Sequence, residues 1–113
     1  MCIAKCSCGN IYLQLSHTPK SIARCYCSIC QSIHHQPFSS FCEYQQGDVQ
    51  IISPKDSLIG LYSSSNRAHR AFCLQCKDWI FMQYKNSQKI WLYLSILQFP
   101  DPICISTYDI YKT

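Results

Sequence analysis

The sequence lacks several features that would assign it to a common class of protein. Within its 113 residues, no uninterrupted apolar run approaches the roughly eighteen residues that a membrane-spanning helix needs. The stretch "MCIAKCSCG" at residues 1–9 lacks the long apolar segment of a secretory signal. We also find no internal repeat, low-complexity tract or linker. We therefore expect one compact domain over residues 1–113, in a soluble cytoplasmic protein without a membrane partner.

Cysteine, by contrast, is abundant, with ten in the chain. Such a density indicates either a disulfide scaffold or a metal framework. Seven of the ten lie in three tight groups: "CSC" (Cys6, Cys8), "CYCSIC" (Cys25, Cys27, Cys30) and "CLQC" (Cys73, Cys76). Cysteines one or two positions apart readily share one metal ion, whereas a disulfide across so short a loop is usually strained. The spacing therefore favours metal.

The three groups suggest how the ligands are divided. A structural zinc is held by four thiolates in a tetrahedron, commonly two from each of two turns. The first and last groups, remote in sequence, can supply these four and clip the two ends of the domain together. The middle group then forms a three-thiolate site, and three protein ligands with a vacant position are typical of a catalytic zinc. We predict two Zn²⁺ ions per chain.

The middle group has a second interpretation, as another structural site closed by a fourth protein ligand. The candidates for that ligand are Cys42, His34 and His35. A histidine pair of this kind is more often partly exposed and inert. Cys2 and Cys104 are expected to be small buried or terminal residues rather than ligands.

No run of Lys or Arg accompanies the formal net charge of +4. The densest basic stretch is "NRAHR" at residues 66–70. Seven thiolates on two Zn²⁺ ions would add three negative charges in total, which leaves the domain near +1. General binding of a polyanion is therefore weakly supported, and we expect no nucleic-acid partner.

Alternating apolar and polar residues predict many short strands. The predicted strands cover residues 10–16, 21–26, 38–44, 49–52, 57–62, 68–72, 79–84 and 89–97. Residues 28–35 are expected to form one or two helical turns, which Pro37 ends, and the tail at 103–113 is a candidate edge strand. This pattern predicts a mainly β domain of curled antiparallel sheets.

The order of the cysteine motifs resembles that of the glutathione-dependent formaldehyde-activating enzyme (GFA) family, which includes centromere protein V. The matching pieces are "CSCG" at 6–9, "CYCSIC" at 25–30 and "SSNRAHRAFCLQC" at 64–76, within a match from residue 6 to about 82. The resemblance implies a β-tent fold, in which twisted antiparallel sheets are joined by zinc. It also implies carbon–sulfur lyase activity on a thiol adduct such as S-hydroxymethylglutathione, with a small thiol such as glutathione as partner.

The resemblance also assigns roles to individual residues. It assigns a structural zinc to Cys6, Cys8, Cys73 and Cys76, and a catalytic zinc with an open position to Cys25, Cys27 and Cys30. Arg70 either clamps a carboxylate of a glutathione-like substrate or covers the sulfurs of the last turn. The alternative function is a non-catalytic, zinc-stapled module that binds a protein or nucleic-acid partner.

Several positions depart from the family pattern. Tyr26 stands where the family usually has histidine, and Gln31 where it usually has arginine. "SIHHQ" at residues 32–36 replaces a stretch with a glycine, so His34 and His35 can close over the metal. Lys77 stands in a glycine position, where a positive φ would cost about 1 kcal/mol. The loss of the arginine charge weakens anion binding near the open site.

Overall fold

The structure is a computed structural model that describes residues 2–26, 28–52, 59–63, 68–98 and 106–110, apart from the side chains of Cys30 and Ser106. The elements, with η for a 3-10 helix, are β1 (Cys2–Lys5), β2 (Tyr12–Leu15), β3 (Ser21–Cys25), α1 (Ser28–His34), β4 (Ser39–Gln45), η1 (Gln46–Asp48), β5 (Val49–Ile52), β6 (Ile59–Ser63), β7 (Ala68–Cys73), β8 (Trp79–Tyr84), β9 (Lys89–Tyr93), η3 (Leu94–Ile96), β10 (Leu97–Gln98) and β11 (Ser106–Ile110). Within the described ranges no helix is long and apolar enough to cross a membrane.

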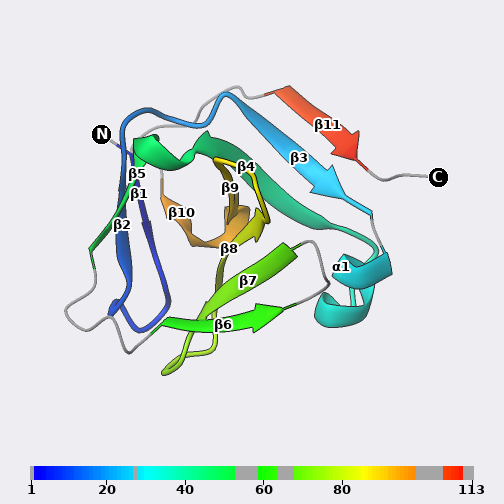
Figure 1. The fold of residues 1–113 in the computed structure, drawn as a ribbon, viewed down its shortest axis with the longest axis horizontal. Coiled ribbons are helices and arrows are strands. Elements are labelled where there is room, and N and C mark those ends of the chain that lie inside the picture. Colours follow the sequence, from blue (N-terminus) through cyan, green and yellow to red (C-terminus); the bar gives the residue numbers. More distant parts are fainter. Residues whose placement is uncertain (1, 27, 53–58, 64–67, 99–105, 111–113) are drawn as a thin grey trace.

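The strands form two sheets, as Figure 1 shows. The small sheet has the order β10-β1-β2-β5, and the large sheet has the order β11-β3-β4-β9-β8-β7-β6. The described strand pairs are antiparallel except for β11, which joins β3 in parallel at the edge of the large sheet. The prediction of a mainly β domain of twisted sheets is confirmed, as is the edge strand in the tail.

The sequence-based prediction missed two short strands of the small sheet. β1 lies in residues 2–5, for which no element had been predicted, and Cys2 and Ala4 point into the core with no exposed surface. The predicted strand at 89–97 is divided, because the 3-10 turn η3 takes the chain from β9 in the large sheet to β10 in the small one. Residues 57 and 58 of another predicted strand lie outside the described ranges.

The main core lies between the two sheets. Leu13 and Leu15 of β2 meet Cys42 and Tyr44 of β4 and Leu92 of β9 in one cluster of buried side chains. Each large apolar side chain removed from water in this way stabilises the fold by about 1.5–3 kcal/mol. The two sheets are therefore held face to face by ordinary hydrophobic packing over most of their contact.

The large sheet has a second face, turned away from the small sheet. Because side chains alternate along a strand, Phe41 points to the face opposite its neighbour Cys42. Phe41 packs there with Cys25, Met82 and Tyr93 in a separate buried cluster. We call this side of the large sheet the second face.

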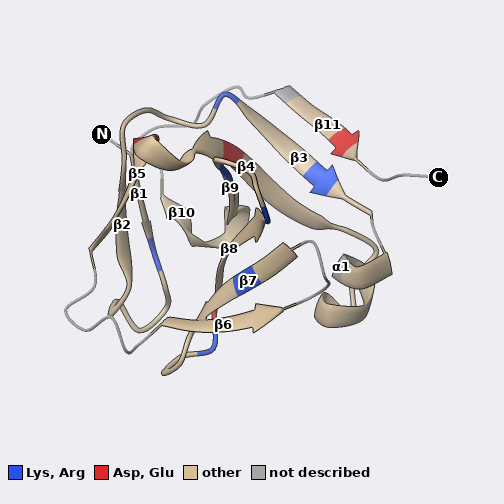
Figure 2. Ribbon diagram, viewed as in Figure 1, with Lys and Arg blue, Asp and Glu red and all other residues tan. Residues whose placement is uncertain are grey.

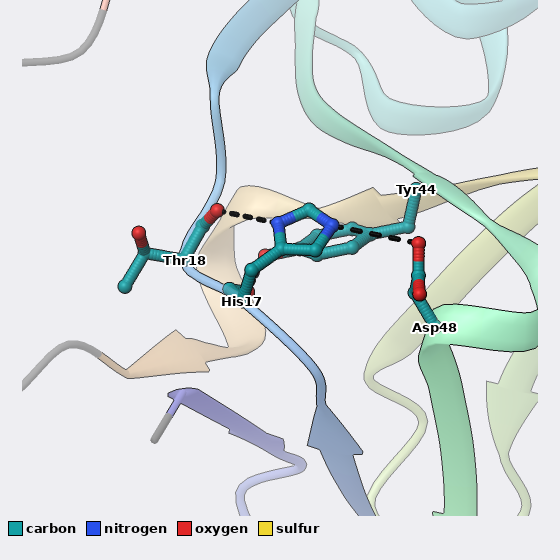
Figure 3. Close-up of polar contacts among 4 residues, drawn as sticks. All are labelled: His17, Thr18, Tyr44 and Asp48. Carbon is teal, nitrogen blue, oxygen red and sulfur yellow. Dashed lines mark hydrogen bonds and ion pairs between the residues drawn. The ribbon is translucent and has the colours of Figure 1, made fainter.

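Polar contacts fasten the segment where the chain leaves the small sheet after β2 (Figure 3). The ring of His17 stacks on Tyr44 with centroids 4.9 Å apart, and the Tyr44 hydroxyl donates to the His17 carbonyl at 3.1 Å. The two ring nitrogens lie 2.8 Å from the Thr18 carbonyl oxygen and 3.5 Å from a carboxylate oxygen of Asp48. These contacts hold the segment after β2 against β4 and η1.

Gly60 on the edge strand β6 allows the Phe72 ring of β7 to lie close to the β6 backbone. It pairs with Phe72 of β7, and a Cβ atom added at Gly60 would lie only 2.6 Å from the tip of the Phe72 ring and 2.9 Å from a methyl of Leu74. The Phe72 ring is held in turn against Trp79, with centroids 5.5 Å apart. The Phe72 ring can therefore occupy this place only because Gly60 has no side chain.

We predict that Gly60→Ala lowers the free energy of unfolding by about 1–3 kcal/mol, because Phe72 must move from its place against Trp79. Urea denaturation of the purified protein measures the change. Gly47→Ala is the matched control, since a Cβ there meets nothing within 4 Å, and it should leave stability unchanged or slightly raised. Equal stability of the two variants would contradict the packing described for Gly60.

Candidate functional site

The four cysteines of the first and last groups come together in space. The sulfurs of Cys6, Cys8, Cys73 and Cys76 all lie within 4.8 Å of one another. Two of the separations are 3.5 Å, for Cys6 and Cys8, and 3.6 Å, for Cys8 and Cys73. A zinc ion with Zn–S bonds of about 2.3 Å needs sulfurs about 3.8 Å apart in a tetrahedron. The geometry of this four-cysteine cluster therefore suits a metal ion.

The two cysteine turns have the same backbone design. The turn between β1 and β2 is closed by a hydrogen bond of 2.9 Å from the Gly9 amide to the Cys6 carbonyl. The turn between β7 and β8 is one residue longer and is closed by a bond of 2.8 Å from the Lys77 amide to the Cys73 carbonyl, so in both turns the residue after the second cysteine donates to the first cysteine. Gly9 has a φ of 78° and Lys77 a φ of 68°. Lys77 thus adopts the left-handed conformation at a cost of about 1 kcal/mol, far below the binding energy of a structural zinc.

Backbone amides point at the sulfurs of the buried cysteines. The Ile11 amide lies 3.4 Å from the Cys6 sulfur, and the Cys76 amide lies 3.5 Å from the Cys73 sulfur. Burial alone raises the pKa of Cys73, but hydrogen bonds from the amides of Cys76 and Gln75 and from the neighbouring thiols outweigh it and lower that pKa to about 7. Donors of this kind stabilise the thiolate form that a metal ion requires.

Side chains within the turns brace them against each other. The amide and the hydroxyl of Ser7 donate to one carboxylate oxygen of Asp78, at 2.7 and 2.5 Å. The Asn10 side-chain amide donates to the Gln75 side chain at 2.6 Å and contacts the Cys8 sulfur at 3.4 Å. Sequence reasoning missed these braces. Their only signal was that polar residues occupy the turn positions beside the cysteines.

The middle group is described only in part. Cys25 ends β3 on the second face of the large sheet and has no exposed surface. Cys27 and the side chain of Cys30 lie outside the described residues, although the backbone of Cys30 belongs to α1. The three-thiolate site therefore stays a prediction.

The candidates for a fourth ligand lie in different surroundings. Cys42 lies between the sheets, on the face of β4 opposite Cys25, and burial raises its pKa to about 12. His35 is exposed, with a φ of 53°, just beyond the end of α1. The Nε2 atom of His34 lies 2.9 Å from the Tyr93 hydroxyl. Of these candidates, His34 is the one whose ring contacts a residue of the second face.

Arg70 contacts the same Tyr93 hydroxyl as His34. Its side chain is only 1% exposed, and its Nη1 atom donates to the Tyr93 hydroxyl at 2.7 Å. Burial, followed by the positive charge of Arg70, lowers the pKa of His34 to about 4. His34 is therefore neutral at pH 7, and its Nε2 atom can accept the Tyr93 proton. Arg70, Tyr93 and His34 join β7, β9 and α1 through one buried hydroxyl.

A cleft of about 920 Å³ opens beside His34 and Tyr93. His34 of α1, Ser39 of β4, Trp79 of β8 and Tyr93 of β9 are among the residues that line it. Ser39 is the direct partner of Cys25 in the ladder between β3 and β4, so both side chains lie on the same face. The cleft therefore reaches the strand partner of Cys25, while Cys25 itself is buried behind the residues that line it.

Gln31, the residue in the family's arginine position, lies on the exposed side of α1. Its side-chain amide donates to the Pro37 carbonyl at 3.0 Å and so ties the helix to the segment that leads into β4. A neutral structural contact is thus found where the family usually has a cation.

Comparison with known proteins agrees with this architecture. A crystal structure of a Rhodobacter sphaeroides protein has the same fold, with a TM-score of 0.70 over 94% of this chain and 99% of that one, at 18% sequence identity. An uncharacterized lyase of Schizosaccharomyces pombe is 27% identical over 107 residues, which cover 88% of this chain and 75% of the yeast protein. Residues 1–111 match the family described as glutathione-dependent formaldehyde-activating enzyme. The chain therefore belongs to the glutathione-dependent formaldehyde-activating enzyme family.

Proposed function

We propose that this protein is a zinc-dependent carbon–sulfur lyase that acts on the adduct of a small thiol. The observation that carries the proposal is the arrangement of the cysteines. Four of them form a cluster between a turn of the small sheet and a turn of the large one, while Cys25 lies apart from them on the second face, near a cleft of about 920 Å³. A volume of this size suits a small molecule.

The two cysteine sites would serve different purposes. The four-cysteine cluster would hold one Zn²⁺ ion with all its positions filled, which leaves no place for a substrate. Its role is to stabilise the fold. Cys25, Cys27 and Cys30 would hold the second ion with a vacant position. A Zn²⁺ ion bound there would lower the pKa of an incoming thiol and stabilise the thiolate as a leaving group.

The residues around the cleft support the bond-breaking step. In an adduct R–S–CH₂–OH, the carbon–sulfur bond breaks with its electrons going to sulfur, while the hydroxyl group gives its proton to water and its oxygen becomes the carbonyl oxygen of formaldehyde. Cys25 is fixed by the β3 ladder, so that the reacting sulfur would meet a rigid site. Trp79 and Tyr93 provide aromatic walls that reduce the access of water.

We predict two zinc ions per chain in protein that has never been exposed to a chelator, measured by elemental analysis. Cys73→Ser should lower the melting temperature and soluble yield far more than Cys27→Ser, since metal binding at the four-cysteine cluster is part of the folding free energy. Cys42→Ala is the control and should keep both ions. A content of one ion or fewer in the unaltered protein would contradict the two-site division, and equal damage from Cys73→Ser and Cys27→Ser would make the middle site structural.

We predict that the zinc-loaded protein accelerates the release of formaldehyde from S-hydroxymethyl adducts of small thiols. Cys27→Ser should reduce the rate at least about a hundredfold, because the leaving thiolate loses its stabilisation. Cys42→Ala again serves as the control and should retain the rate. If Cys27→Ser has the rate of the unaltered protein, or if no adduct is turned over, the lyase proposal fails and a non-catalytic binding module becomes the better description.

A further inference from the structure

Little charge faces the cleft beside Cys25. Among the described residues that line it, the charged side chains are Lys77 and Asp78, which cancel each other. The Asp78 carboxylate is already bound by the amide and hydroxyl of Ser7. α1, whose last turn lines the cleft, carries no Lys, Arg, Asp or Glu (Figure 2). An anionic ligand would therefore find little compensation for its lost hydration here.

The buried cation Arg70 is not placed to meet a ligand. Its side chain is 1% exposed, it does not belong to the cleft lining, and its Nη1 atom donates to Tyr93. Its charge is directed instead at Tyr93 and His34. A carboxylate of glutathione cannot reach Arg70 without rearrangement of this buried chain.

The walls of the cleft are aromatic. The rings of Trp79 and Tyr93 lie at 29° to each other with centroids 6.2 Å apart. The His34 ring stands edge-on to both, at 85° to Trp79 and 80° to Tyr93. Other rings also pack against Trp79 and Tyr93, so a planar ligand would meet the parts of these rings that line the cleft, where it can stack or pack edge-to-face.

Ser39 adds a polar group that lacks a partner. The residue is 6% exposed and lines the cleft, and its hydroxyl has no hydrogen-bond partner among the described residues. A buried hydroxyl without a partner is destabilising, so such groups usually serve a ligand or a bound water. Because Ser39 is paired directly with Cys25, the two Cβ atoms are about 4.5–5.5 Å apart. A ligand whose sulfur lies near Cys25 would therefore place an oxygen on the next carbon close to Ser39.

We propose that the cleft binds the adduct of an uncharged aromatic thiol, whose oxygen accepts or donates a hydrogen bond at the Ser39 hydroxyl. The inference rests on the proposed function, which brings a thiol adduct to Cys25, and it adds the class of thiol. The aromatic group lies against Trp79 and Tyr93, the sulfur points toward Cys25, and glutathione is a poor ligand.

The first test measures ligand class by fluorescence. The chain has two tryptophans, so that Trp91→Phe leaves Trp79 as a reporter within the cleft. The zinc-loaded variant is titrated with benzyl mercaptan, with 4-(mercaptomethyl)benzoate, which has the same shape with a carboxylate, and with glutathione. We expect benzyl mercaptan to bind at least about tenfold more tightly than either anion, since a buried carboxylate lacks a partner. Equal or tighter binding of either anion, or no response to benzyl mercaptan, overturns the proposal.

The second test isolates Ser39. The ligands are 2-(benzylthio)ethanol, a stable analogue of the adduct, and benzyl propyl sulfide, in which a methyl group replaces the hydroxyl. Ser39→Ala should weaken binding of the alcohol about five- to tenfold, the effect of one hydrogen bond, and leave the sulfide unchanged. Ser95→Ala, an exposed serine of the same cleft, is the control and should change neither. If Ser39→Ala affects both ligands equally, or neither, Ser39 does not hold the oxygen.

These titrations report binding, not turnover. If the uncharged ligands bind as expected and no adduct is cleaved, the ligand class stands and the lyase proposal fails. If adducts are cleaved but the anionic thiols bind as well as benzyl mercaptan, the lyase proposal stands and the ligand class is wrong.

Discussion

Repulsion between thiolates is the constraint on which the rest of this fold depends. Four sulfurs within 4.8 Å of one another cannot all be ionised without a cation, since each pair of unit charges at 4 Å is opposed by about 4 kcal/mol at an effective dielectric constant of 20. The backbone amide of Asn10 lowers the pKa of Cys8, but desolvation and the neighbouring thiols raise it more, to about 11. A divalent cation reverses the sign of this interaction and turns the cluster into the strongest link between two turns that are 65 positions apart.

That link determines where a reaction site can be built. The cluster joins the β1–β2 turn of the small sheet to the β7–β8 turn of the large one, next to the core that both sheets share (Figure 1). With the sheets joined at this edge, the second face of the large sheet is left to α1 and the aromatic side chains. Trp79 follows the last cysteine turn directly, so one wall of the cleft is anchored by the cluster itself. The four-cysteine cluster and the cleft thus occupy separate parts of one scaffold.

The parts that the sequence predicted are those encoded over short distances. Pairs of cysteines one or two residues apart indicated the metal turns, and alternation indicated most strands. β10 was missed because two residues carry too little pattern, and β1 because its apolar residues Cys2, Ile3 and Ala4 do not alternate with polar ones. The pairing of these two strands also joins opposite ends of the chain. The contacts of Arg70, Tyr93 and His34 escaped for the same reason, since three elements distant in sequence meet at one hydroxyl. A lone serine such as Ser39 has no sequence signal until burial reveals it.

The position of Arg70 changes what its charge does. An arginine in a metal-binding motif suggests a contact with an anionic substrate, yet here the guanidinium is buried and its charge acts on Tyr93 and His34. A buried cation of this kind orders the groups around it, because moving any of them would leave the charge less well solvated. Arg70 therefore fixes the aromatic wall. Under the proposed function, the choice of thiol adduct would then fall to uncharged groups around the cleft, among them His34 and Ser39.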